Sequence, residues 1–351
     1  MILPYATGEL EGTGGRLRAR DGHFVVEEIP LYDASGTGSH LYLNFTKERL
    51  TTKEACGIIS GASGVNEKEI GFAGMKDKHA VTTQTFSIPV PNMNSGDVDL
   101  LIARMESLPM KLNWAKLHGN KLRTGHLLGN RFTILISGID GSIDSALEKA
   151  EAVGRMIKER GIPNYFGEQR FGAEGDNHEK GMKIINGTMR VGNRWLRRFL
   201  VSSFQSHMCN IYLSERFNRG LFWRILEGDI AKKHDTGGLF EVSDEKECQK
   251  RFDSHEISFT APIYGSKMWS ASGEPGRLEQ EIFSSCGVSA EQLASAGVEG
   301  TRRLGRLLVP DLVARKSAEG LTVSFSLPKG AFATTVMREI MKKDMDSSDS
   351  V

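Results

Sequence analysis

The sequence predicts a mixed α/β fold of the α+β kind, in which one sheet is assembled from distant parts of the chain and interrupted by an inserted domain. Three observations lead to this prediction. Segments with the strand period of two come from both ends and from the middle of the chain. Segments with helical periodicity lie between them. The stretch 190–307 differs from its surroundings and is followed by another strand-like segment.

Alternation of polar and apolar residues is clearest in residues 321–327, where four apolar side chains share one face while Thr and Ser face the other way. Three earlier segments have a similar pattern: residues 41–45, 83–88 and 132–136. Because these segments are far apart in the sequence, a sheet that contains them all has to be built from distant parts of the chain.

Helices are expected between these strands. Residues 145–160 have a helix-like pattern. In a second segment, apolar side chains recur at three- and four-residue steps: Leu200, Phe204, Met208, Ile211 and Tyr212. Helices and strands together place the chain in the mixed class.

The stretch 190–307 contains an acidic run at 241–256 and Gly-, Ser- and Pro-containing breaks near 270–276. A strand-like segment follows it, so the chain returns to the sheet that it began. We therefore expect an inserted domain at residues 190–307. The first domain would then consist of residues 1–189 and 308–351.

Composition excludes several classes of protein. The 351 residues are 39% hydrophobic and 25% charged with a net charge of +1, as in an ordinary soluble protein. Four scattered cysteines without Cys-x-x-Cys spacing argue against a zinc knuckle and a disulfide framework. Residues 1–12 do not resemble a targeting sequence, and no stretch approaches the roughly 20 apolar residues of a membrane span. We therefore expect a cytoplasmic protein that does not enter a membrane.

Two basic runs stand out in this nearly neutral chain. Residues 111–131 contain five Lys or Arg and no acidic residue, and residues 180–198 contain six and again none. Such runs are typical of proteins that bind a phosphate backbone. The alternative is a pair of solvated faces without a partner.

The most informative segment is residues 71–85. A Gly-bearing turn delivers the carboxylate of Asp77, flanked by Lys76 and Lys78, to the start of an alternating strand. Nearby cations favour an ionised carboxylate, which suits nucleophilic or electrostatic work better than general-acid catalysis. The alternative is an ordinary Asp in a surface turn with solvated lysines.

At this point the sequence resembles a known family. Residues 73–82, Ala-Gly-Met-Lys-Asp-Lys-His-Ala-Val-Thr, resemble the catalytic signature of the TruD family of tRNA pseudouridine synthases. Residues 163–172 are similar to its Asn-Tyr-Phe-Gly-x-Gln-Arg-Phe-Gly motif, and residues 325–339 to its closing motif. Weaker similarities occur at 24–28 and 121–130. The resemblance thus extends over nearly the whole chain.

The resemblance implies a fold and an activity. The fold is a pseudouridine-synthase catalytic domain with a mixed, mainly antiparallel sheet, interrupted by an inserted TRUD-type α/β domain. The activity is isomerisation of a uridine in tRNA to pseudouridine, with uridine-13 of the D-arm as the expected target. The implied partner is tRNA, and we expect a monomer.

The resemblance also implies the site residues. The catalytic nucleophile falls on Asp77, and Arg18 is its expected basic partner. The residues expected to bind the substrate are Phe24, Asn164, Phe166, Phe332, Arg18 and Lys76. An extruded base needs aromatic walls and a partner for its polar edge, which phenylalanines and an amide supply. Taken singly, each phenylalanine could instead be a core residue, and the asparagine a turn residue.

The chemistry leaves three routes open. The carboxylate can attack C6 of the base, attack C1′ of the ribose, or help to expel uracil as a glycal forms. None of the routes transfers electrons, so we expect no cofactor and no metal. The base that removes the C5 proton is not identified, and Tyr165 is a candidate only if its side chain faces the pocket.

Two alternative functions remain. One keeps the chemistry and changes the substrate to another tRNA position or another RNA. The other is a non-catalytic RNA-binding protein, in which Asp77 only holds a turn. An Asp-dependent hydrolase ranks last, because neither a second carboxylate at a suitable spacing nor a metal motif is present.

Overall fold

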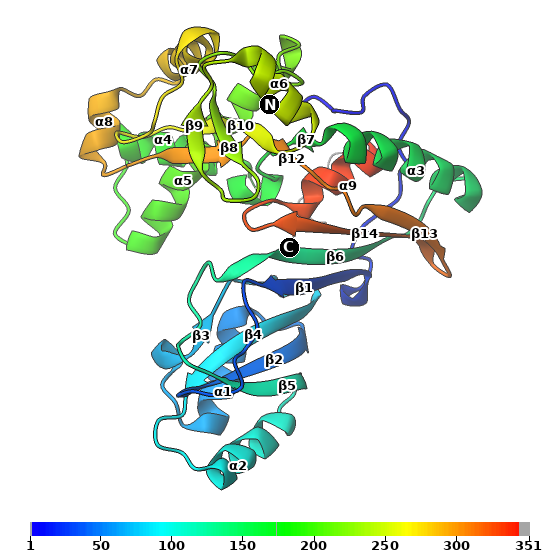
Figure 1. Ribbon diagram of the computed structural model, residues 1–351, viewed down its shortest axis with the longest axis vertical. Coiled ribbons are helices and arrows are strands. Elements are labelled where there is room, and N and C mark those ends of the chain that lie inside the picture. Colours follow the sequence, from blue (N-terminus) through cyan, green and yellow to red (C-terminus); the bar gives the residue numbers. More distant parts are fainter. Residues whose placement is uncertain (1, 173, 344–351) are drawn as a thin grey trace. The chain divides into compact units, whose positions relative to one another are not determined.

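The computed structural model describes residues 2–172 and 174–343, which form two compact units (Figure 1). The sheet unit comprises residues 13–154 and 311–330, and the helix unit comprises residues 2–12, 155–310 and 331–343. Both units combine distant segments of the chain. The two units are distinguished by their compactness, whereas the insertion at 190–307 was predicted from the composition of the sequence. The limits of that inserted domain therefore stay a prediction.

The sheet unit contains an eight-stranded mixed sheet. Its strands are β1 (Phe24–Pro30), β2 (His40–Glu48), β3 (Gly71–Phe72), β4 (Val81–Pro89), β5 (Lys111–His118), β6 (Leu127–Ile136), β13 (Val313–Ser317) and β14 (Gly320–Pro328). Their order is β13-β14-β6-β1-β4-β2-β5, with β3 beside β4. Strands β1 and β4 are parallel and the other described pairs are antiparallel. The expected mixed sheet is confirmed.

Distant segments lie side by side in this sheet, as the sequence predicts. Strand β14, near the carboxyl end of the chain, pairs with β6 from Leu321 to Pro328 (Figure 1). Burial alternates along β14, as the pattern at 321–327 predicts. In β2, by contrast, residues 41–45 are buried on both faces, because the two faces contact separate groups of apolar side chains.

Two helices cover the apolar face that includes Phe45 and Phe86: α1 (Thr52–Ser63) and α2 (Ser95–Glu106). Helix α1 begins with a capping box, in which Thr51 and Glu54 each bond the other's backbone N–H at 3.1 and 2.7 Å. The expected helix at 145–160 is confirmed as α3 (Ile143–Arg160). Short 3-10 helices occur at η1 (Asp21–His23) and η2 (Glu67–Glu69).

The helix unit is built around the 25-residue helix α5 (Arg194–Asn218), whose predicted apolar face is confirmed by the burial of Leu200, Phe204, Met208 and Tyr212. Its other helices are α4 (Asn177–Ile185), α6 (Glu245–Asp253), α7 (Gly273–Ser285), α8 (Ala290–Ser295) and α9 (Ala333–Met341). An antiparallel sheet in the order β11-β10-β8-β9 comprises β8 (Ile230–Lys233), β9 (Leu239–Glu241), β10 (Ile257–Ile263) and β11 (Thr301–Leu304). A second, two-stranded sheet pairs β7 (Ile162–Pro163) with β12 (Arg306–Leu307).

A buried ion pair fastens the end of α5. Both side chains of Arg216 and Asp229 are fully buried, and the guanidinium bonds the two carboxylate oxygens at 2.6 and 2.7 Å. The same guanidinium donates to the Tyr212 hydroxyl at 3.0 Å. The pair therefore joins the last turns of α5 to the chain just before β8.

None of the helices within 2–172 and 174–343 is long and apolar enough to cross a membrane.

Candidate active site

The turn that carries Asp77 connects β3 to β4 and is anchored from below. The backbone N–H of Lys76 donates to the Thr52 hydroxyl of α1 at 2.8 Å, and that hydroxyl donates to the Gln84 amide at 3.1 Å. The fully buried Gln84 side chain also donates to the carbonyl of Gly74. These bonds hold the backbone on the amino-terminal side of Asp77 in one position.

A buried ion pair lies under the same turn. The Lys76 ammonium is 3.0 Å from a carboxylate oxygen of Glu28 on β1, and the two side chains are only 5% and 3% exposed. Lys76 therefore points into the sheet unit, whereas the flanking Lys78 is half exposed and pairs with Glu54 at 3.1 Å. The two lysines that look equivalent in the sequence thus have different environments.

Asp77 presents its carboxylate to solvent beside an arginine. One oxygen lies 3.4 Å from Nη2 of Arg18, and 46% of the Asp77 side chain is exposed against 8% of the Arg18 side chain. Arg18 has a φ of 54°, a left-handed conformation that is uncommon outside glycine and is typical of functional sites. Its guanidinium also lies 4.2 Å from the centre of the Phe24 ring.

Phe24 is buried, so its ring does not present an open face on which a base could stack. Its ring is covered by Arg18, and its other near neighbour is the ring of Phe132 at 6.2 Å in an edge-on arrangement. In the sheet unit, Phe24 therefore supports Arg18 from beneath. The structure brings Arg18, Phe24, Lys76 and Asp77 together, and they all belong to this one unit.

The sequence analysis did not find Lys47, which lies on β2 near the same turn. This lysine is 2% exposed, and its ammonium donates to the carbonyl of Leu50 at 2.5 Å. The pKa of Lys47 is lowered to about 8, mainly by burial and in part by the charge of Lys76, while Asp77 opposes the shift. Lys47 occurs within an alternating strand without a motif around it, so no sequence signal distinguished it from a surface lysine.

The other predicted residues lie in the helix unit, after β7. Asn164 is buried, and its amide donates to the carbonyl of Leu304 at 2.9 Å and accepts from Nη2 of Arg303 at 2.8 Å. Arg303 also donates to the backbone carbonyl of Asn164 at 3.1 Å. One N–H and one lone pair of the amide are not used in these bonds.

Arg303 also organises the aromatic pair formed by Phe166 and Phe332. The two ring centres are 5.8 Å apart, and the guanidinium lies 3.9 Å from the centre of Phe166 and 5.9 Å from that of Phe332. Burial lowers the pKa of Arg303 to about 10, so it remains a cation at neutral pH. At Gly167 a Cβ atom would lie 2.7 Å from the Thr334 hydroxyl, so a larger residue there would have to displace the Thr334 side chain.

Arg303 was missed by the sequence analysis, because it stands outside every string that resembles a known motif. The only available signal was a pair of adjacent arginines in a four-residue segment, Thr301 to Leu304. Such a pair is common on protein surfaces. Only the fold places one of these arginines over the aromatic pair.

Tyr165 does not fit the role of a base for C5. Its side chain belongs to the core of the helix unit, and burial raises its pKa, so the phenol stays neutral. Its hydroxyl is buried without a hydrogen-bond partner among the described residues. Tyr165 was a candidate only if its side chain faced the pocket, and its burial in this core does not favour that role.

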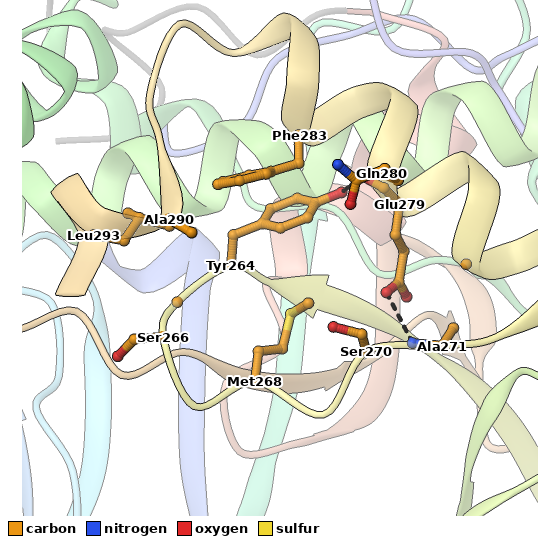
Figure 2. A pocket seen from close by; sticks show the side chains of 12 residues that line it. Tyr264, Ser266, Met268, Ser270, Ala271, Glu279, Gln280, Phe283, Ala290 and Leu293 are labelled. Carbon is orange, nitrogen blue, oxygen red and sulfur yellow. Dashed lines mark hydrogen bonds between the residues drawn. The ribbon is translucent and has the colours of Figure 1, made fainter.

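The helix unit has a cavity of about 270 Å³ between α7, α8 and the segment after β10 (Figure 2). The Tyr264 and Phe283 rings stack in it, 5.3 Å apart. Its buried carboxylate, Glu279, accepts from the Ala271 N–H at 3.0 Å and from Arg302 at 2.7 Å. Both oxygens of this carboxylate accept hydrogen bonds from the protein itself. We therefore do not assign a catalytic role to this cavity.

The basic runs lie in different units: residues 111–131 in the sheet unit and residues 180–198 in the helix unit. Not all of their cations are open to a partner. Lys121 donates to the carbonyl of Lys68 at 2.8 Å, and Arg197 donates to that of Ala296 at 3.3 Å.

Within the described parts of the chain, no group of three or more His, Cys, Asp or Glu side chains is placed to hold a metal ion.

Comparisons with known proteins agree with one another. A family model described as tRNA pseudouridine synthase D (TruD) matches residues 2–192 and 189–340. A Thermus thermophilus relative named tRNA pseudouridine synthase D is 42% identical over 339 residues, covering 97% of this chain and 92% of its own. One of the same name from Anaeromyxobacter sp. (strain Fw109-5) is 39% identical over 347 residues, covering 97% and 96%. A solved structure from Methanosarcina mazei, named for the same family, shares the fold with a TM-score of 0.78 at 24% identity, covering 98% and 97%.

Proposed function

The chain belongs to the tRNA pseudouridine synthase D (TruD) family, and from this premise we propose that it isomerises uridine-13 in the D-arm of tRNA, with Asp77 as the nucleophile. The observation that carries the proposal is the half-exposed Asp77 carboxylate, held beside Arg18 on an anchored turn within the signature at 73–82. An exposed carboxylate on a fixed backbone can approach a nucleotide without rearrangement of the turn.

The reaction breaks the bond between N1 of uracil and C1′ of the ribose and forms a bond between C5 and C1′. The proton on C5 is lost and N1 gains one, so the product is an isomer of the substrate. The Asp77 carboxylate forms a temporary bond to C6 or to C1′, or assists the departure of uracil as a glycal forms. Arg18 keeps the attacking oxygen in place, and Phe24 supports Arg18 from beneath.

We assign the binding of the extruded uracil to Asn164, Phe166 and Phe332. The N–H and the lone pair that remain on the Asn164 amide match the donor and acceptor edge of uracil. The two phenylalanines, each partly exposed, supply apolar walls, which repay part of the cost of unstacking the base. Arg303 acts as a positioning residue, because it holds the Asn164 amide and covers Phe166.

The remaining expectations belong to the same proposal. Lys76 influences the substrate through the turn that it anchors with Glu28, and exposed cations of the basic runs contact tRNA phosphates. The protein acts in the cytoplasm as a monomer and uses no cofactor, since an isomerisation transfers no electrons.

The test compares Asp77→Asn and Asp77→Glu with the wild type on unmodified tRNA transcripts, by mapping pseudouridine at each uridine. Asp77→Asn should lower turnover by about a thousandfold or more, because an amide has almost no nucleophilicity. Asp77→Glu should lower it by roughly a hundredfold, since one methylene moves the oxygen by about 1 Å. Both variants should fold, because the Asp77 side chain is half exposed and the bonds that hold its turn do not involve its carboxylate.

Asp140→Asn is the matched control, because Asp140 is also exposed and lies in the sheet unit. It should retain wild-type turnover. Turnover of Asp77→Asn within about tenfold of wild type, after mass spectrometry has excluded deamidation, would show that Asp77 is not the nucleophile. Pseudouridine at another position, or in another RNA, would keep the chemistry and correct the substrate.

A further inference from the structure

The largest exposed aromatic side chain of the helix unit lies at the start of α5. Trp195 is 69% exposed, and its ring stacks on that of Phe199, one helical turn later, with the centres 5.4 Å apart and the planes within 3°. Residues four apart lie on the same side of a helix, so the two stacked rings form one aromatic surface. Leaving such a surface in water is unfavourable unless a partner covers it.

This surface is continuous with the nucleotide-binding residues proposed above. The Arg170 guanidinium lies 5.2 Å from the centre of Phe199 and 6.0 Å from the centre of Phe166. Arg170 is fixed by bonds to the hydroxyls of Ser206, at 3.2 Å, and Ser202. A continuous series therefore runs from the stacked rings of Trp195 and Phe199 through the Arg170 guanidinium to the Phe166 ring, all within one compact unit.

Several exposed cations lie close in sequence to the exposed end of this series. Lys183, Arg190, Arg194 and Arg198 are exposed, and no ion pair to any of them is present among the described residues. The nearest ion pair along the chain joins Lys180 to Asp176 at 2.8 Å and involves none of these four cations. Arg194 and Arg198 are one turn apart and flank the row formed by Trp195 and Phe199.

An aromatic surface flanked by cations fits a single-stranded nucleic acid. Every base has a π face that stacks on a planar ring, and the phosphates on either side of it need cations within reach. An apolar protein partner would match the rings but would place no negative charge opposite Arg194 and Arg198. The chemistry of this surface thus favours an unpaired nucleotide over a protein.

We propose that Trp195 and Phe199 form a second stacking site, which binds an unpaired base of the substrate tRNA near the target nucleotide while Arg194 and Arg198 contact the adjoining phosphates. This inference rests on the proposed function, because it takes the RNA strand to extend from the nucleotide bound at Phe166. Stacking of a base on an aromatic ring is worth about 1–3 kcal/mol, or roughly five- to hundredfold in affinity.

The experiment measures tRNA binding and single-turnover pseudouridine formation for Trp195→Ala, Trp195→Leu and Trp195→Phe. Ala and Leu should weaken binding by about five- to hundredfold, whereas Phe should restore most of it, because only Phe keeps a π face. The rate at saturating protein should stay within about twofold of wild type, since the site binds and does not react. Trp269→Ala is the control, because Trp269 is also exposed and belongs to the same unit.

The double variant Arg194→Ala/Arg198→Ala should reduce the slope of log affinity against log salt by about 1.4, the contribution of two contacts to a single strand. An affinity equal to that of the wild type in Trp195→Ala or in Trp195→Leu would overturn the proposal. Ultraviolet crosslinking of the wild type to tRNA should join Trp195 to an unpaired nucleotide, and a crosslink to a paired one would also overturn it. If the wild type forms no pseudouridine in any tRNA, the proposed function fails instead.

Discussion

Replacing Glu28 by Gln should both destabilise the sheet unit and lower catalysis. The carboxylate of Glu28 lies 3.0 Å from the Lys76 ammonium, with the side chains 3% and 5% exposed. Glu28→Gln leaves a buried ammonium without its counter-charge, which typically costs about 3–5 kcal/mol. This is a large share of the roughly 5–15 kcal/mol that stabilise an ordinary domain.

Catalysis should fall as well, because Lys76 precedes Asp77 and its side chain must find another environment. A displacement of the carboxylate by about 1 Å is enough to cost roughly a hundredfold in turnover. The double variant Glu28→Gln/Lys76→Met has no buried charge left at this position, so its stability should return to within about 1 kcal/mol of wild type. Its backbone anchor, the Lys76 N–H to Thr52, is unaffected by the side-chain change.

Urea titration followed by hydrogen exchange of peptides from residues 13–154 measures the stability of the sheet unit by itself. Pseudouridine formation under fully folding conditions measures catalysis separately. A loss below about 1 kcal/mol in Glu28→Gln, or no recovery in the double variant, would show that the ion pair does not stabilise this unit.

Three further outcomes can be measured. Burial lowers the pKa of Lys47 to about 8. Between pH 8 and 10 the folded chain therefore releases a proton that the unfolded chain still binds. This difference makes the free energy of unfolding rise with pH. Urea titrations at pH 8, 9 and 10 should show a smaller rise in Lys47→Met. Arg303→Met removes the donor to the Asn164 amide and should lower turnover by roughly ten- to hundredfold, while Arg303→Lys should fail to rescue it. Asp229→Asn leaves Arg216 buried and unpaired, which should cost the helix unit about 3–5 kcal/mol in a urea titration without changing turnover of the folded protein.

The strands and the turn that carries Asp77 could be predicted because they depend on local order in the chain. Alternation at 321–327 marked a strand with one buried face, and the structure confirms it in β14. The Gly-bearing turn and its neighbouring lysines marked Asp77 as a chemically suited carboxylate. Its exposure beside Arg18 results from the pairing of segments 59 residues apart, a separation that no local pattern reports.

The roles of individual cations and rings depend on burial, which the sequence does not contain. Lys76 and Lys78 flank Asp77 equally in the chain, yet one pairs inside the sheet unit and the other lies at its surface. Phe24 supports Arg18 instead of presenting an open face.

By itself, the sequence determined the mixed fold, the turn that bears Asp77 and the motif that contains Asn164 and Phe166. Tertiary structure alone decided that Arg303 covers that motif and that Arg170, within the motif, contacts Phe199, on which Trp195 stacks. The physical reason is that the periodicity of a segment indicates which of its residues face the protein interior. A contact between a ring and a guanidinium depends instead on which distant segments meet in the folded chain.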